Sequence, residues 1–441
     1  MQLFAPKTFT AFRNYKPKDY ISDIVAGIIV AIIALPLSIA LAIASGATPE
    51  TGLFTAIIAG FVTALLGGSK VNITGPTAAF ATIVAGIILN QGMDGLFLAT
   101  MMAGLLLILM GVARVGLLIK YIPHTITVGF TAGIAVTLVI GQLKDFLGLT
   151  YPTGTVAIET VDKLTLVVEN ISTLNPWALG VGLLGLAILI LWPKVSKKIP
   201  GSLIAVLVGS LIALIPVINA NTIGSLYTIS AALPTFHFPE ITAERILALL
   251  PSAFTIALLA GIESLLSCVV SDKMVGDKHN SNTELIALGV GNLLVGCFGG
   301  IPATGAIART AANVKNGGKS PLSGMVHAVV LLLVLVLLMP LASYIPMPII
   351  AAILFIVAYN MSEWREFVAV MKTKKWNDIL VLVLTFALTV IFDLVKAIAV
   401  GLIVHYVILF VRSRIERRKL AEEKADIIEE TMVVIEEKEK D

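Results

Sequence analysis

Long apolar stretches without a single charge recur along the chain and constrain its fold more than any other feature. The first, Ile24–Ala44, contains no Asp, Glu, Lys or Arg and is long enough to cross a bilayer as a helix, which takes about 20 mostly apolar residues. Inside lipid, only helices and closed barrels satisfy their backbone hydrogen bonds. Hydropathy predicts twelve helical spans: Ile24–Ala44, Leu53–Leu66, Leu96–Val112, Val128–Leu143, Ala178–Leu191, Leu203–Ile218, Ile246–Val270, Leu285–Phe298, Val326–Leu341, Ile349–Tyr359, Ile379–Phe392 and Ala397–Val411.

The composition leaves no other class open. Of the 441 residues, 57% are apolar and 13% are charged, whereas about 25% of a soluble domain is charged. The charges also cluster, because Arg412–Asp441 alone holds 8 Lys/Arg and 10 Asp/Glu. Too few remain to cover a soluble core, which excludes a soluble enzyme, a nucleic-acid-binding protein and a disordered scaffold. The sequence predicts an all-α polytopic membrane protein whose partner is the lipid bilayer.

Two further segments, Thr77–Asn90 and Thr304–Asn313, are too short or too polar to cross alone. Counting both as passes and placing the N-terminus inside puts 26 Lys/Arg in cytoplasmic loops and tails and four outside, as the positive-inside rule requires. Omitting either segment would reverse the predicted side of the loops between them, and Lys and Arg would no longer be concentrated on the cytoplasmic side. We therefore predict 14 transmembrane segments in the cytoplasmic (inner) membrane, with both termini cytosolic.

The predicted organisation has five parts. A cytosolic segment (1–20) precedes the first seven spans (21–220), and an extracytoplasmic loop (221–245) leads to the second seven (246–411). A charged cytosolic tail (412–441) ends the chain, and its opposite-charge pattern is compatible with a solvated helix or a homodimer contact.

A weak internal repeat places the two short segments in matching positions. Each follows an apolar span that ends in a Gly-Gly pair, Gly67–Gly68 in one half and Gly299–Gly300 in the other. Each then begins with a polar, Pro- and Gly-containing opening: Gly75, Pro76 and Thr77, or Pro302, Thr304 and Gly305. The two halves enter the membrane from opposite sides in the predicted orientation, so the sequence predicts a 7+7 inverted repeat.

Matched, interrupted segments of this kind are the best sequence indication of a transporter's binding site. A helix N-terminus offers free N–H groups and a partial positive charge, and two such termini near the midplane can bind an anion. The alternative is that these Gly and Pro residues only pack or bend the helices. The matched pair favours the binding site.

Ionisable residues within spans are rare and usually functional. Glu263 lies deep in its span, and Ser267 follows one helical turn later on the same face. This pair could carry a proton or bind Na⁺. Arg309 lies in the second short segment and could bind a substrate anion. The alternative is a structural ion pair between Glu263 and Arg309.

The remaining reactive residues indicate no chemistry. His327 and His405 are interpreted as packed histidines, and Cys268 and Cys297 as small core residues. No His, Cys and carboxylate cluster has metal-ligand spacing, and no GxxxxGK[ST] loop for ATP is present. We therefore expect transport without catalysis and without a cofactor, apart from Na⁺ or H⁺ as a coupling ion.

At these residues the chain resembles a known family. The run IESLLSCVVSDKMVGDKHNSNTELIALGVGNLLVGCFGGIPATGAIARTAANVKNGGKSPLSG is similar to the second-repeat core of the SulP anion permeases, which include sulfate permeases and multifunctional anion exchangers. IALPLSIALAIASG and GSKVNITGPTAAF are similar to that family's first and third helices. Within the family, the sodium-dependent bicarbonate transporters of cyanobacteria are most similar.

The resemblance implies a core domain (helices 1–4 and 8–11) that moves against a gate domain (helices 5–7 and 12–14) in an elevator-type motion. It implies that the substrate lies between the N-termini of short, broken helices 3 and 10. Carried over by position, the substrate contacts are Ser38, Thr77, Ala78, Gly305 and Ala306. The cation site is Glu263 with Ser267, and Na⁺ is compatible with it.

Two features differ from the family pattern. The bicarbonate transporters have a pattern resembling IDSLLT at the cation site, whereas this chain has Glu263 and Ser267 in IESLLS. The longer carboxylate is common in members thought to use protons or to exchange anions, so Na⁺ and H⁺ both stay open. Most members also carry a C-terminal STAS domain of about 100 residues or more, and the 30 residues after Val411 leave no room for one.

The leading hypothesis is a secondary active transporter of a small inorganic anion, bicarbonate or sulfate, coupled to Na⁺ or H⁺ through Glu263. An uncoupled exchanger or channel of the same fold is the first alternative, with Glu263 and Arg309 as a fixed pair. A dicarboxylate transporter and a nucleobase permease are further alternatives.

Overall fold

The structure is a computed structural model. It describes residues 4–12, 15–116, 123–152, 155, 157, 159–196, 199–373, 375–392, 397, 399–411 and 413–414. The described residues are mostly helical, with two strands of two residues each, β1 (Thr74–Gly75) and β2 (Thr304–Gly305). Of the predicted C-terminal tail, only residues 413 and 414 lie within the described part.

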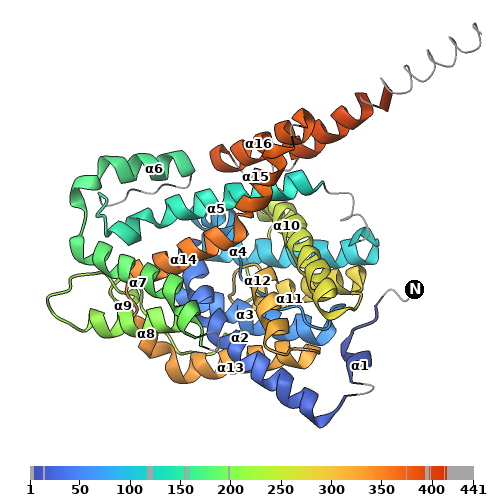
Figure 1. Cartoon of the computed structure of the whole chain (residues 1–441). Helices are drawn as coiled ribbons and strands as arrows, with labels where there is room; N and C mark the ends of the chain where they lie inside the picture. The colour runs from blue at the N-terminus through green and yellow to red at the C-terminus, as the bar shows by residue number, and fades with distance from the viewer. Residues whose placement is uncertain are drawn as a thin grey trace, which may run out of the picture. The chain divides into compact units, whose positions relative to one another are not determined.

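The described residues of the first half of the chain contain eight α-helices (Figure 1). They are α1 (Thr8–Ala11), α2 (Pro17–Ala44), α3 (Pro49–Leu66), α4 (Ala81–Val112), α5 (His124–Leu147), α6 (Thr160–Glu169), α7 (Pro176–Val195) and α8 (Gly201–Ala213), with the 3₁₀ turns η1 (Ala78–Phe80) and η3 (Ile171–Thr173). Helix α4 breaks at Gly92, whose φ is 70°. The break falls between the predicted segments Thr77–Asn90 and Leu96–Val112, so α4 supplies two successive segments.

The second half adds α9 (Ile223–Leu226), α10 (Ala243–Val275), α11 (Ser281–Cys297), α12 (Ile307–Lys315), α13 (Pro321–Leu338), η4 (Met339–Tyr344), α14 (Met347–Met361), α15 (Trp364–Lys372) and α16 (Trp376–Ile391). A last apolar helix covers Ala399–Val411. Eight of the described helices are long and apolar enough to cross a membrane. The prediction of 14 passes fits these elements and stays a prediction.

Several helix starts follow from local sequence. Proline occupies the first turn of α7 and α13, where its missing N–H costs nothing. The residue before each proline caps the helix: the Asn175 side chain accepts from the N–H groups of Trp177 and Ala178, and the Ser320 hydroxyl accepts from Leu322 N. Such side chains satisfy backbone donors that the helix itself leaves free.

The two halves of the chain meet at glycine-lined crossings. Helices α10 and α11 pack against α4, and α11 also packs against α3, which places segments far apart in sequence side by side in Figure 1. At the α4–α11 crossing, a Cβ added to Gly104 would lie 2.6 Å from the Gly289 carbonyl oxygen, and the reverse distance is also 2.6 Å. Small residues allow this close backbone approach in membrane helices.

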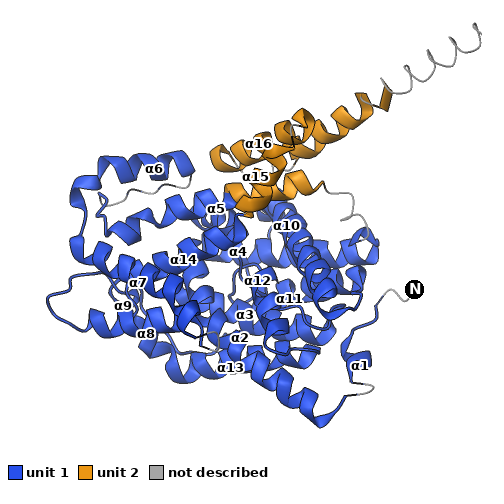
Figure 2. Cartoon of the chain, in the orientation of Figure 1, with its two compact units in different colours: residues 1–121, 134–362 blue, residues 122–133, 363–441 orange. Residues whose placement is uncertain are grey.

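The chain divides into two compact units (Figure 2). Unit 1 comprises residues 1–121 and 134–362, and unit 2 comprises residues 122–133 and 363–441. Within unit 2 the start of α5 packs on α16, since a Cβ on Gly129 would lie 2.8 Å from the Leu382 carbonyl oxygen. All predicted site residues belong to unit 1. The predicted repeat boundaries and the core and gate domains stay predictions.

We predict that Gly104→Ala lowers the stability of the purified protein by about 1–3 kcal/mol, because the new methyl group overpacks backbone atoms that cannot move aside. Gly86→Ala is the matched control on the same helix, since nothing lies within 4 Å of a Cβ there. Thermal unfolding in detergent measures both. Equal unfolding temperatures for the two variants would contradict this account of the crossing.

Candidate functional site

The two interrupted segments pair with each other through their backbones. Strands β1 and β2 are antiparallel, with Thr74 opposite Gly305 and Gly75 opposite Thr304. The Ala306 N–H extends the pairing by donating to the Ile73 carbonyl at 2.8 Å. Each strand is followed within a few residues by a helix start, η1 and α4 after β1 and α12 after β2. Because the strands run in opposite directions, the two helix N-termini follow opposite ends of this short ladder.

This arrangement places four of the predicted substrate contacts at the two helix starts that follow the ladder. Thr77 is the N-cap residue of η1 and Ala78 its first residue, while Gly305 ends β2 and Ala306 is the N-cap residue of α12. No side chain caps the start of α12. Helix N-termini with free N–H groups bind anions through backbone donors and the helix dipole. The geometry therefore provides backbone donors from both halves of the chain.

Glu263 lies on α10 and reaches the first of these helix starts. It is half-buried, and the Thr77 side chain is its neighbouring polar group. A carboxylate thus stands beside the N-cap residue of η1. No ion pair joins Glu263 to Arg309 within the part of the chain that the structure describes.

Arg309 comes from the first turn of α12 and extends under β1. Its residue exposure is 3%. Its Nη2 donates to the Pro76 carbonyl at 3.2 Å, and its Nη1 is buried without a hydrogen-bond partner among the described residues. A Cβ on Gly75 would lie 2.4 Å from Nη1, so the missing side chain of Gly75 leaves room for the guanidinium. The site thus holds a buried positive charge with unused hydrogen-bonding capacity.

Ser38 and Ser267 have different surroundings from the other predicted residues. Ser38 on α2 is fully buried, and its hydroxyl has no partner among the described residues. The Ser267 hydroxyl donates to Asn72 Oδ1 at 2.7 Å and lies 3.1 Å from Thr310 Oγ1. Glu263 and Ser267 share a helix face, but their polar neighbours differ: Thr77 for Glu263, and Asn72 and Thr310 for Ser267.

A buried polar network centred on Asn72 lies beside the ladder, and no signal in the sequence predicted it. The Asn72 Oδ1 accepts from Ser267 and, at 3.0 Å, from Thr310, while its Nδ2 donates to Glu284 at 2.7 Å and to Ser264 at 3.3 Å. Thr310 Oγ1 in turn accepts from the Ile73 N–H at 2.9 Å. The network ties the residues before β1 to α10, α11 and α12.

Glu284 anchors the far end of this network. It is 2% exposed, and its Oε2 accepts from the N–H groups of Gly68 and Ser69 at 2.8 and 3.1 Å. A Cβ on Gly68 would lie 2.1 Å from the Asn280 carbonyl oxygen. The Gly-Gly pair noted in the sequence therefore marks a backbone segment held by a carboxylate from the other half.

A second buried carboxylate, Asp23 on α2, caps the start of α13. It accepts from the N–H groups of Lys319 and Ser320 at 2.7 and 3.2 Å and from the hydroxyls of Tyr15 and Ser320. Burial, and then the bond to Asp23, raise the pKa of the Tyr15 hydroxyl. Asp23 acts as a structural cap, because its hydrogen-bond partners among the described residues are donors at the start of α13 and the Tyr15 hydroxyl.

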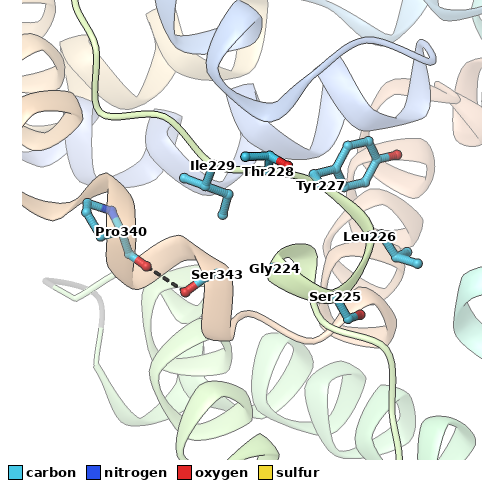
Figure 3. Close-up of a pocket in the computed structure, with 8 residues that line it drawn as sticks. All are labelled: Gly224, Ser225, Leu226, Tyr227, Thr228, Ile229, Pro340 and Ser343. Carbon is cyan, nitrogen blue, oxygen red and sulfur yellow. Dashed lines mark hydrogen bonds between the residues drawn. The ribbon is translucent and has the colours of Figure 1, made fainter.

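A separate pocket of about 500 Å³ lies between α9 and η4 (Figure 3). Its lining comprises Gly224, Ser225, Leu226, Tyr227, Thr228, Ile229, Pro340 and Ser343, and the Ser343 hydroxyl donates to the Pro340 carbonyl at 2.6 Å. None of these residues belongs to the predicted site. Among the residues that the structure describes, no group of three or more His, Cys, Asp or Glu could hold a metal ion.

Comparison with known proteins identifies the family of this chain. The model of the sulfate permease family matches residues 20–385. The chain belongs to the sulfate permease family. This confirms the family expected from the sequence motifs.

Two relatives within the sulfate permease family are similar over most of the chain. The Bacillus subtilis protein YvdB, which bears the provisional name of a sulfate transporter, is 45% identical over 93% of this chain and 77% of its own length. The bicarbonate transporter BicA of Picosynechococcus is 34% identical over 90% of this chain and 70% of its own length. Both are named as transporters, in agreement with the expectation of transport without catalysis.

A solved structure confirms the predicted fold class. The transmembrane domain of a cyanobacterial bicarbonate transporter, BicA, superposes with a TM-score of 0.78 at 33% identity, covering 88% of this chain and 98% of that domain. The chain therefore has the all-α transmembrane fold of this sulfate permease family member. The placement of the site residues in this chain follows from its own contacts.

We predict that Asn72→Asp destabilises the protein by about 3 kcal/mol or more, because it sets an unpaired carboxylate against buried Glu284. Combining it with Glu284→Gln should recover more than half of this loss. The glutamine side chain introduced there could accept from Gly68 and Ser69 through its oxygen and donate to the new carboxylate through its nitrogen. Thermal unfolding of the single and double variants measures the coupling.

Asn170→Asp is the matched control, since Asn170 donates only to the Leu166 carbonyl one turn back on α6. Its unfolding temperature should stay close to that of the wild type. If the losses of Asn72→Asp and Glu284→Gln simply add in the double variant, the two side chains are not energetically coupled and this account of the network is wrong.

Proposed function

We propose that the chain is a secondary active transporter of small inorganic anions, bicarbonate or sulfate, coupled to Na⁺ or H⁺ through Glu263. The observation that carries the proposal is Arg309. Its guanidinium is buried beside the paired helix openings, donates one hydrogen bond to a carbonyl, and has a second nitrogen without a partner among the described residues. An anion is the ligand that this group lacks.

The energetics support this assignment. A charge in a protein interior is strongly destabilising unless it is paired and hydrogen-bonded. Arg309 has no carboxylate within ion-pair distance among the described residues. The backbone donors at the starts of η1 and α12 add to the positive field. A small anion between Thr77, Ala78, Gly305 and Ala306 would compensate the guanidinium in a site that needs no other charged side chain.

Glu263 supports the coupling part of the proposal. Glu263 is half-buried and neighbours Thr77, a residue of the proposed anion site. A cation or proton on Glu263 would therefore change the potential at the anion site directly. Ser267 bonds to Asn72 and Thr310, so its proposed contribution to a Na⁺ site requires those bonds to rearrange.

The uncoupled alternative has less support. It requires Glu263 and Arg309 to form a fixed internal pair, whereas no ion pair joins them among the described residues and Arg309 donates to the Pro76 carbonyl. A dicarboxylate or a nucleobase remains a competing substrate class. We further propose the cytoplasmic membrane as location, cytosolic termini, a homodimer, and an elevator-type motion of the core against the gate.

We predict that the protein reconstituted in liposomes takes up labelled bicarbonate or sulfate in response to a Na⁺ or pH gradient. Arg309→Gln should raise the KM of the anion at least roughly tenfold, because a hydrogen bond from a charged donor contributes about 1.5–3 kcal/mol. Glu263→Gln should remove the response to the cation gradient. A panel of anions, dicarboxylates and uracil, with Na⁺ and pH varied independently, identifies substrate and coupling ion.

Glu240→Gln is the control for the removal of a carboxylate, since Glu240 is exposed and lies outside the proposed site. Its uptake should match that of the wild type. Gradient-driven uptake that persists unchanged in Glu263→Gln would exclude the coupling role of Glu263, and uptake indifferent to both gradients would favour the exchanger or channel.

A further inference from the structure

His327 on α13 is a buried histidine without visible partners. Its exposure is 0%, and neither ring nitrogen has a hydrogen-bond partner among the described residues. The sequence analysis interpreted it as a packed histidine. A neutral imidazole carries one N–H donor and one acceptor nitrogen, and each buried unsatisfied group costs about 1–3 kcal/mol. Packing alone does not explain why this position holds a histidine.

The surroundings of His327 place it next to β1. A Cβ on Gly60 of α3 would lie 3.6 Å from His327 Nδ1 and 3.3 Å from the Thr74 carbonyl oxygen. The absence of a side chain at Gly60 thus lets His327 and the Thr74 carbonyl lie close to α3. The Thr74 hydroxyl is also buried and unpartnered among the described residues.

Arg309 approaches the same strand at the next residue. A Cβ on Gly75 would lie 2.4 Å from Arg309 Nη1 and 3.7 Å from Ala56 Cα of α3. Ala56 and Gly60 are one helical turn apart on α3. The guanidinium of Arg309 therefore lies near one turn of α3 and the imidazole of His327 near the next, and both groups border the region between α3 and β1. Arg309 is also the charged group that acts electrostatically on the His327 ring.

The unpartnered groups define the chemistry of a ligand. Nη1 of Arg309 offers N–H donors, and His327 offers one donor and one acceptor. A small guest with oxygen or halide acceptors would satisfy the donors, and a guest that also carries a hydrogen would satisfy the acceptor nitrogen. Buried polar sites of this kind hold water when two to four partners converge.

We propose that His327 and Arg309 form an internal binding site between β1 and α3 for one small hydrogen-bonding guest, which is either a water molecule or the transported anion itself. The site lies on the α3 side of the paired helix openings. Its guest accepts the hydrogen bonds that Arg309 Nη1 does not make within the described residues. The anion as guest rests on the proposed function, whereas water as guest does not. His327 then sets the affinity of the anion site by holding the guest that Arg309 contacts.

Two variants of His327 separate this proposal from simple packing. His327→Leu keeps the approximate volume and removes both polar nitrogens, and His327→Gln keeps a donor and an acceptor. We expect His327→Leu to raise the KM of the anion roughly five- to tenfold, the loss of about one hydrogen bond, with His327→Gln closer to the wild type. His405→Leu, the same change on another apolar helix outside the site, should leave KM unchanged.

A packed histidine predicts the opposite result. His327→Leu would then unfold at a higher temperature than the wild type, since it removes two unsatisfied nitrogens, and would keep the wild-type KM. That combination would overturn the proposal. If His327→Leu does not fold, two other measurements test the proposal. These are the KM of His327→Gln relative to the wild type and the electron density between His327 and Arg309 in the wild type.

The wild-type protein also allows a direct test. In a high-resolution crystal structure grown with selenate or bromide, an anomalous peak between His327 and Arg309 identifies an anion, and density without an anomalous signal identifies water. Absence of density there overturns the site. This outcome is distinct from failure of the proposed function, in which wild-type liposomes take up no anion while the guest density is still present.

Discussion

The structure depends on the pairing of two short backbone segments, β1 and β2, among described residues that are mostly helical. Breaking a helix at membrane depth exposes N–H and C=O groups that lipid cannot satisfy, at a cost of several kcal/mol for each group. Two breaks that meet satisfy part of each other, through the register of Thr74 with Gly305 and Gly75 with Thr304. A single interrupted helix would have to find hydrogen-bond partners for its backbone groups elsewhere. Both halves of the repeat are therefore needed to form the site.

Side chains from the same and from the opposite half of the chain then hold the approach to each strand. Glu284 and Asn72 brace the segment before β1, and Asn292 binds both the N–H and the carbonyl of Ala303 just before β2. Thr55 of the first half likewise accepts from the Ile301 N–H at 2.8 Å. Because every brace is a hydrogen bond in a low-dielectric interior, each is stronger than in water. The position of the helix N-termini is therefore over-determined.

The sequence predicted much of this architecture because its signals are local. Apolar length defines the spans, and the Gly, Pro and Thr openings in Gly75–Thr77 and Thr304–Gly305 mark the breaks. The network around Asn72 escaped prediction because its partners lie about 200 residues away, and only folding brings them together. Helical spacing correctly put Glu263 and Ser267 on one face, yet it could not show that the two side chains select different partners. His327 likewise looked like an ordinary apolar-helix histidine until its neighbours were known.

The balance of charge gives the proposed coupling a physical basis. The site holds one guanidinium, Arg309, and one carboxylate, Glu263, which are not paired with each other among the described residues. If both are ionised, the ligand-free site is neutral, and a monovalent anion makes it negative by one unit. Moving a net charge through a low-dielectric region is costly, and one Na⁺ or H⁺ on Glu263 restores neutrality. A divalent anion would leave one negative charge after the same step. On this argument the site favours a monovalent anion carried with one cation, while sulfate requires a second positive charge from elsewhere.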